Sequence, residues 1–263
     1  MSITINAQVC LLLTVRFSQR DETEVLSTTQ WEELCLALGG VSEIGILLDG
    51  STVEILQDYN VNKDLQERVV PLLSRGVGLA LASEKWLRAG VWVIGAGDPE
   101  YPRGLSRLEV GKRPPLLFGY GSLEMLEQPA VGVDERLSQV DFAKVSSAVG
   151  ELRACTVGLL DRSHSRAVIR ESLSHGGQAL AVTYKDLVSY GSTPELREAI
   201  MNGGLTIVSS KPPGRHGHDG PVYEEEMVAG LSDLALTQKV LDHFKVGEAE
   251  GNDPPAQQLD FEF

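Results

Sequence analysis

Asp161, Ser163 and His164 bring the residue types of nucleophilic catalysis together within a short run. A serine nucleophile needs a histidine base within hydrogen-bond reach, and the base needs an orienting carboxylate. Residues this close in sequence on a turn or helix do not face one another, so the run cannot form that arrangement. We therefore predict no catalytic residue and no enzymatic activity for this chain.

A glycine-rich run at 215–219 contains two histidines and a carboxylate, His216, His218 and Asp219. Imidazole nitrogens bind transition metals well. A zinc site takes three or four protein ligands, and no further ligand stands at the usual spacing here. We interpret the run as a loop without ligand function, and the sequence predicts neither a metal nor a cofactor.

Arg162, Arg166 and Arg170 recur every fourth residue, so on a helix they would share one face. The whole chain carries a net charge of −14, and no long segment of it is basic. Nucleic-acid affinity rests largely on Lys and Arg neutralising phosphates. The composition therefore disfavours a broad nucleic-acid surface and leaves this arginine face as a local candidate. We expect Lys185 and Asp186 to lie on the solvated surface.

The chain has 263 residues, 42% apolar and 23% charged, which is typical of a globular protein with one large or two modest domains. No apolar run reaches the roughly 18 residues that cross a bilayer, so we expect no membrane association. The run 9–15 lacks the flanks of a signal peptide. Cys10, Cys35 and Cys155 stand far apart, as expected for buried thiols of a cytoplasmic protein.

Helical patterns dominate the first 90 residues. Ser27 precedes an apolar run that ends at Gly39 and Gly40, which predicts a capped helix. The leucines and isoleucine over 34–48 suggest that a second helix packs beside it. Further helices are expected at 62–75 and 79–89.

Beyond residue 90 short apolar strands alternate with helices of about ten residues, a pattern that predicts βα units and an α/β fold with a mostly parallel sheet covered on both faces. Expected strands are 91–94, 116–118, 130–133, 154–160, 178–183 and 205–209, and expected helices are 137–149, 163–174, 193–202 and 222–231. Residues 234–240 suit either a strand or a helix.

Residues 97–121 combine a Gly-Asp-Pro-Glu-Tyr-Pro turn, two spaced leucines and an Arg-Pro-Pro-Leu-Leu-Phe-Gly-Tyr-Gly strand. This order resembles the entrance to the core of the DNA-processing protein A (DprA/Smf) family, and the resemblance extends over roughly 28–240. It implies a helical N-terminal domain, 1–90, followed by a Rossmann-like three-layer domain, 91–245. Without the resemblance, the same residues indicate only a rigid linker that leads into a buried strand.

The family's ligand loops are degenerate in this chain. Its Val-Gly-Ser-Arg turn corresponds to 131–136, where Gly132 and Arg136 remain but two acids stand between them. Its second, glycine-rich loop corresponds to 158–165, where Gly158 remains and leucines replace other glycines. Arg162 and Arg166 follow. We predict that this degenerate ligand pocket consists of Gly132, Arg136, Gly158, Arg162 and Arg166.

The family's Arg-Asn-Arg triplet, implicated in gripping single-stranded DNA, corresponds to Glu224-Glu225-Glu226. The apolar half of that motif remains at 227–232. Replacing cations by anions in a phosphate groove turns attraction into repulsion. Glutamates are also ordinary in the first turn of a helix, where they face the positive end of the helix dipole.

Residues 246–263 contain five acidic and no basic residues, and we expect them to be a disordered tail. The tail ends in Gln258, Leu259, Phe261 and Phe263, which resembles the short motif that docks bacterial proteins on the sliding clamp. Glu262 stands where that motif usually has Phe. The alternative is that this aromatic tail folds back on its own domain.

These features predict a non-enzymatic, cytoplasmic DprA-like protein that acts through protein partners in DNA processing or in antiviral defence. Candidate partners are a DprA-like paralogue, a recombinase or a sliding clamp. One alternative is a single-stranded DNA-binding protein of natural transformation and DNA recombination, acting through the arginine face. The other is a nucleotide-binding or nucleotide-processing enzyme, for which Asp134, Glu135 and Asp161 are the nearby acids.

Overall fold

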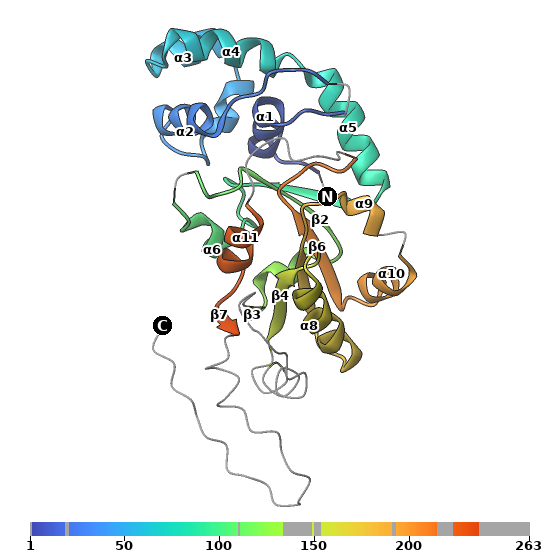
Figure 1. The fold of residues 1–263 in the computed structure, drawn as a ribbon. Coiled ribbons are helices and arrows are strands. Elements are labelled where there is room, and N and C mark those ends of the chain that lie inside the picture. Colours follow the sequence, from blue (N-terminus) through green and yellow to red (C-terminus); the bar gives the residue numbers. More distant parts are fainter. Residues whose placement is uncertain are drawn as a thin grey trace, which may run out of the picture.

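The computed structural model describes residues 2–18, 21–109, 111–133, 149, 154–190, 193–214 and 223–236. Helices α1–α5 gather at one end of a central sheet, with α6 and α11 on one side of it and α8–α10 on the other (Figure 1). The helical elements are α1 (Ile5–Thr14), α2 (Thr28–Ala37), η1 (Ile44–Leu48), α3 (Thr52–Asp58), α4 (Lys63–Leu73), α5 (Gly76–Arg88), α6 (Arg103–Ser106), η2 (Leu123–Glu127), α8 (Ser163–Ser174), α9 (Leu187–Tyr190), α10 (Pro194–Met201) and α11 (Glu224–Gly230).

The described strands form one sheet of seven in the order β1-β2-β6-β5-β4-β3-β7. Their bounds are β1 (Val91–Gly95), β2 (Leu116–Tyr120), β3 (Ala130–Val133), β4 (Cys155–Leu159), β5 (Ala179–Val182), β6 (Leu205–Ser209) and β7 (Leu234–Leu236). Strands β3 to β7 pair in parallel, whereas β1 and β2 run antiparallel at one edge. The α/β class with a mostly parallel sheet is confirmed, and the open choice for 234–240 resolves as a strand at its start.

Apolar side chains cover both faces of the sheet, which makes the fold three-layered. One core joins α1, α2, α4 and α5 to the face of β2, β5 and β6 that α8 also covers. Trp86 of α5 packs edge-on against Phe118 of β2, with ring centroids 5.3 Å apart. The opposite face packs against α6 and α11 through Leu105, Met227 and Leu231. The helical layer therefore packs directly on the sheet. The division of the chain into a helical domain, 1–90, and a Rossmann-like domain, 91–245, stays a prediction.

The residues of the 97–121 motif serve to tie elements together. Asp98 accepts hydrogen bonds from the Gly95 amide at 2.7 Å and from the Thr4 hydroxyl at 2.6 Å, which links the end of β1 to the N-cap of α1. Tyr101 is buried and donates its hydroxyl to the Pro114 carbonyl at 2.6 Å. The two halves of the motif, separated by α6, are thereby joined by one buried hydrogen bond.

Replacing Tyr101 by phenylalanine should lower the free energy of unfolding by about 1–2 kcal/mol, because the buried Pro114 carbonyl loses a hydrogen-bond donor. Urea denaturation followed by circular dichroism would measure the loss. Tyr59→Phe is the matched control, since Tyr59 is 42% exposed. Equal stability of the two variants would contradict the structural role of this hydroxyl.

Most expected elements occur close to their expected bounds. Ser27 caps α2 with a reciprocal pair of hydrogen bonds to Gln30, as its position predicted. One expectation is wrong. The second helix inferred near 44–48 is the short 3-10 helix η1. A glycine lies within this segment and residues 49–51 separate it from α3, so it has room for only one short helical stretch. The expected helix at 137–149 lies outside the described residues, apart from the buried Val149.

Candidate functional site

Ligands of open parallel sheets bind beyond the carboxyl ends of the strands. In this chain Asp161 follows β4, Thr183 and Lys185 follow β5, and Lys211 follows β6. These three strands are neighbours in the sheet, so their ends meet at one edge. We refer to the residues that follow them, together with the first turn of α11, as the carboxyl edge.

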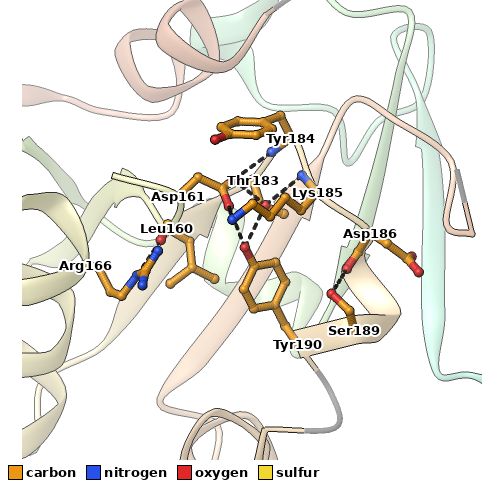
Figure 2. Close-up of polar contacts among 9 residues, drawn as sticks. All are labelled: Leu160, Asp161, Arg166, Thr183, Tyr184, Lys185, Asp186, Ser189 and Tyr190. Carbon is orange, nitrogen blue, oxygen red and sulfur yellow. Dashed lines mark hydrogen bonds and ion pairs between the residues drawn. The ribbon is translucent and has the colours of Figure 1, made fainter. Parts of the chain in front are cut away.

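Asp161 occupies the centre of the carboxyl edge (Figure 2). Its side chain is fully buried. The Oδ2 atom accepts hydrogen bonds from the Thr183 hydroxyl at 2.6 Å and from the Tyr184 amide at 3.0 Å. The Oδ1 atom accepts from the Tyr190 hydroxyl at 2.6 Å and lies 3.2 Å from Lys185 Nζ. Two hydroxyls, an amide and an ammonium group thus surround one carboxylate, which is the donor set that a bound anion would require.

This environment keeps Asp161 ionised. Burial alone raises the pKa of Asp161, but the hydrogen bonds from Thr183, Tyr190 and Tyr184 and the nearby ammonium of Lys185 lower it below its ordinary value. Burial and the hydrogen bond to the carboxylate raise the pKa of Tyr190, so its hydroxyl stays protonated as a donor. The carboxylate is therefore a charged acceptor whose partners are fixed, and it is a poor general base.

Three cations of the carboxyl edge lie beside acids of the chain itself. The pairs are Lys185–Asp161 at 3.2 Å, Lys211–Glu224 at 3.9 Å and Arg162–Glu225 at 3.9 Å. Glu224 is only 3% exposed, whereas the side chains of Arg162 and Glu225 are mostly exposed. A phosphate approaching this edge would have to compete with these carboxylates for each cation.

Comparison with solved structures finds the same architecture elsewhere. The X-ray structure of DNA processing protein A (DprA) from Streptococcus pneumoniae superposes with a TM-score of 0.50 at 20% sequence identity, over 80% of this chain and 76% of that chain. The chain has a DprA-like fold. A structure of DNA processing protein A from Helicobacter pylori, reported for its single-stranded DNA binding mode, is similar at 14% identity with a TM-score of 0.38, over 55% of this chain and 67% of that one. No protein-family model and no curated protein matches the chain.

On this DprA-like fold, the two glycines of the predicted pocket are needed for close packing. A Cβ atom at Gly132 would lie 2.4 Å from the Ser232 hydroxyl, and one at Gly158 would lie 3.1 Å from the Ser165 Cβ atom. Glycine allows β3 to approach the segment after α11, and it allows β4 to approach the first turn of α8. Close packing is thus sufficient to explain why glycine stands at both positions.

The arginines of the predicted pocket lie on the exposed side of α8 or just before it. Arg166 donates its Nε–H to the Leu160 carbonyl at 2.8 Å, which closes the turn after β4. The three arginines Arg162, Arg166 and Arg170 are all exposed. Arg162 is the N-cap residue of α8 and has an extended backbone, so only Arg166 and Arg170 share a face of the helix, and the predicted face of three arginines is wrong at Arg162. Arg136 lies outside the described residues, as do the histidines of 215–219 and the tail residues Gln258, Leu259, Phe261 and Phe263.

Sequence reasoning placed Lys185 and Asp186 on the solvated surface, and Lys185 is indeed exposed. It missed that both side chains contact other parts of the carboxyl edge. Lys185 pairs with the buried Asp161, and Asp186 Oδ1 accepts from the Gly214 amide at 2.9 Å. A carboxylate two residues after one parallel strand and a hydroxyl directly after the next were the available signal, because adjacent parallel strands bring such positions together.

The remaining reactive groups are inert as placed. Cys10, Cys35 and Cys155 are buried and free, as expected, and burial raises the pKa of each thiol, to about 12 for Cys35 and Cys155. Thiols with such a high pKa are protonated and unreactive near neutral pH. Among the described residues, no three His, Cys, Asp or Glu side chains gather in a way that could hold a metal ion. The same part of the chain contains no helix with the length and apolarity that crossing a membrane needs.

Proposed function

We propose that this chain is a non-enzymatic, DprA-like protein that acts in DNA processing or in defence against foreign DNA through protein partners. The observation that carries the proposal is the buried Asp161 carboxylate, which takes up the donors at the carboxyl edge. A DNA phosphate or a nucleotide would need those donors for itself. The side chain that holds them is covalently attached and fully buried, so an external anion competes poorly.

The acidic first turn of α11 supports the same conclusion. Glu224, Glu225 and Glu226 begin the helix, and two of them lie within 4 Å of a cation at this edge. Phosphate binding depends on free cations. The carboxyl edge therefore keeps the fold of a ligand site, but its cations already have carboxylate partners, so it attracts a polyanion only weakly.

A processing enzyme at this edge is disfavoured by the same geometry. Asp161 is the acid nearest to the degenerate glycine loop among the described residues, and its two oxygen atoms are committed to fixed donors. A general base needs an oxygen within reach of a substrate proton and a pKa near the working pH. Asp161 meets neither condition, since its pKa is lowered.

Single-stranded DNA binding through α8 is the second candidate, favoured by the exposure of Arg166 and Arg170 on one face of the helix and of Arg162 just before it. Two of these three already contact the chain: Arg162 lies 3.9 Å from Glu225, and Arg166 bonds the Leu160 carbonyl. Arginines with internal partners attract phosphate less strongly than free ones. We therefore rank this function below partner binding.

The protein-partner function is tested by capture from host extract with the full chain and with a chain that lacks residues 246–263. We expect a partner, such as a sliding clamp, a recombinase or a DprA-like paralogue, to be retained by the full chain and lost on truncation. In purified form, Leu259→Ala with Phe261→Ala should weaken binding at least about tenfold, because apolar anchors dominate peptide docking in grooves. Gln257→Ala is the matched control.

Equal capture by the full and truncated chains would show that residues 246–263 do not mediate partner binding. If neither chain captured any protein while the full chain turned over a nucleotide, the proposed function itself would be wrong.

A further inference from the structure

A pair of exposed arginines stands on α6, although the chain as a whole carries a net charge of −14. Arg103 begins this short helix, and Arg107 is its C-cap with a helical backbone conformation. Because the two residues are four positions apart, they lie on the same side of the helix. The segment 103–113 also contains Lys112 and Arg113 against one acid, Glu109. This side of the molecule is therefore locally cationic.

The acids around this segment are engaged away from the two arginines. Glu109 pairs with Lys112 at 2.9 Å, and Glu32 of α2 accepts a hydrogen bond from the Gly111 amide. Glu109 and, to a smaller extent, Glu226 raise the pKa of Lys112. In the part of the chain that the structure describes, no acid lies within ion-pair distance of either arginine of α6. Both guanidinium groups are thus open to carboxylates from outside the described residues.

An exposed apolar side chain, Leu36 of α2, lies toward the same segment. Glu32, one turn before it, contacts the Gly111 amide, so the face of α2 that carries both residues points toward 107–113. Leu36 is 83% exposed, more than any other large apolar side chain of the described residues. We refer to Arg103, Arg107 and Leu36 as the α6 surface. It offers two cations and an apolar contact to an occupant.

The tail of residues 246–263 complements the α6 surface in charge and in apolar character. It contains five acidic and no basic residues. At its end two acids, Asp260 and Glu262, alternate with Leu259, Phe261 and Phe263. Carboxylates form charge-assisted hydrogen bonds with guanidinium groups, and phenyl rings bury a large apolar area. The tail thus carries a partner for each kind of group on the α6 surface.

The chain leads from the neighbour of α6 to this tail. Helix α6 lies beside α11 (Figure 1), and a Cβ atom at Gly104 would overlap the Gly230 carbonyl at the end of α11. Strand β7 follows α11 and ends at Leu236. Residues 237–245 connect it to the tail, and a connector of this length spans up to about 30 Å when extended. The tail therefore begins within reach of α6, and its attachment to the same chain favours even a weak contact.

We propose that residues 246–263 dock on the α6 surface of their own chain. Carboxylates of the tail pair with Arg103 and Arg107, and its apolar side chains pack against Leu36. This inference concerns the same tail as the proposed partner binding, but the docking itself needs no partner. A protein that binds the tail would have to displace it from α6, so the α6 surface would regulate partner binding.

The test follows cleavage of the full chain by a glutamate-specific endoproteinase, with mass spectrometry of the released fragment 251–263. Cleavage reports the undocked fraction when docking and release are fast. Arg103→Gln with Arg107→Gln should raise the rate of cleavage after Glu250 about fivefold, since two exposed ion pairs are lost. Arg170→Gln with Arg197→Gln is the matched control, because both residues are exposed on helices at the other side of the sheet (Figure 1). Circular dichroism confirms that each variant is folded.

Two further measurements locate the docked tail. At about 0.5 M salt the ratio of cleavage rates between the double variant and the wild type should fall toward one, because salt screens exposed charges. Arg107→Lys keeps the charge and places an amine where a carbodiimide can join it to a carboxylate in contact. We expect a cross-link from position 107 to residues 246–263 in Arg107→Lys, and far less from position 197 in Arg197→Lys.

Four results would overturn the proposal. The first is equal cleavage of the wild type and the Arg103→Gln, Arg107→Gln variant, and the second is equal cross-linking from positions 107 and 197. The third is a ratio of cleavage rates that grows with protein concentration, which would place the tail on a second copy. The fourth is oligonucleotide binding that this double variant loses while its tail cleavage stays unchanged, which would assign the α6 surface to nucleic acid.

Partner capture that is lost on truncation would stand whichever of these results is found. It depends on the apolar anchors of the tail, whereas the docking depends on the two arginines of α6. Failure of the docking and failure of the proposed function are therefore distinguishable.

Discussion

Asp161→Ala is expected to lower the free energy of unfolding by about 3 kcal/mol, because removing one partner of a buried ionic network strands the others. Thr183, Tyr184 and Tyr190 would each lose an acceptor at a buried position. Lys185 contributes less to this loss, since its side chain is 53% exposed and solvent can replace the carboxylate. Urea denaturation of the two proteins measures the difference.

Asp49→Ala is the matched control for this prediction, because Asp49 is exposed and such surface changes usually stay within about 0.5 kcal/mol. A stability of Asp161→Ala within that range of the wild type would show that the network contributes little. The carboxyl edge would then be free to reorganise around an external anion.

The same carboxylate makes a pH-dependent contribution to stability. Its pKa is lowered in the folded protein, so the folded state holds the charged form more tightly than the unfolded chain does. The stabilisation is therefore complete above about pH 4, the ordinary range of an aspartate, and is lost as the pH falls through the folded pKa. We expect the stability difference between the wild type and Asp161→Asn to be largest near neutral pH and to shrink in acid. A constant difference from pH 7 to pH 3 would contradict this assignment.

Glu225→Arg combined with Glu226→Arg is expected to create affinity for single-stranded oligonucleotides. The double variant releases Arg162 from its acidic neighbour and adds two cations to the first turn of α11. At low salt we expect binding at least about tenfold tighter than that of the wild type, and the slope of log affinity against log salt should steepen by about 0.7 for each new phosphate contact. Fluorescence anisotropy of a labelled oligonucleotide provides the measurement.

A control with the same charge change separates a local groove from net charge. Glu54→Arg with Glu67→Arg places the two cations on exposed positions of α3 and α4, in the helical layer (Figure 1). If both double variants bind oligonucleotide equally well, the effect comes from overall charge alone. The carboxyl edge would then have no special part in it.

Local signals in the sequence were sufficient to predict most of the fold. The Ser27 cap, the glycines after α2 and the strands around Leu116 and Leu205 depend on interactions within a few residues of themselves, and they occur where expected. The short 3-10 helix at 44–48 was harder to predict, because its apolar spacing also suits an α-helix.

The site was less predictable, since its contacts connect distant residues. The donors to Asp161 come from 22 to 29 positions further along the chain, in the segment after the neighbouring strand β5 and in helix α9. In the sequence, Glu224 is typical of the glutamates found in the first turn of a helix. Only the packing of α11 shows that its carboxylate is buried beside Lys211. The sequence predicted the excess of acid at this edge, but not which cations the acids meet.

The central claim is that the cations of the carboxyl edge are already paired with the chain's own carboxylates. The most direct test is the anisotropy of a labelled single-stranded oligonucleotide titrated with the wild-type chain at low salt. We predict affinity weaker than the roughly 10⁻⁴–10⁻⁶ M of non-specific DNA binders, with little dependence on salt. Saturable binding that weakens steeply with salt and disappears in Arg166→Glu would contradict the account.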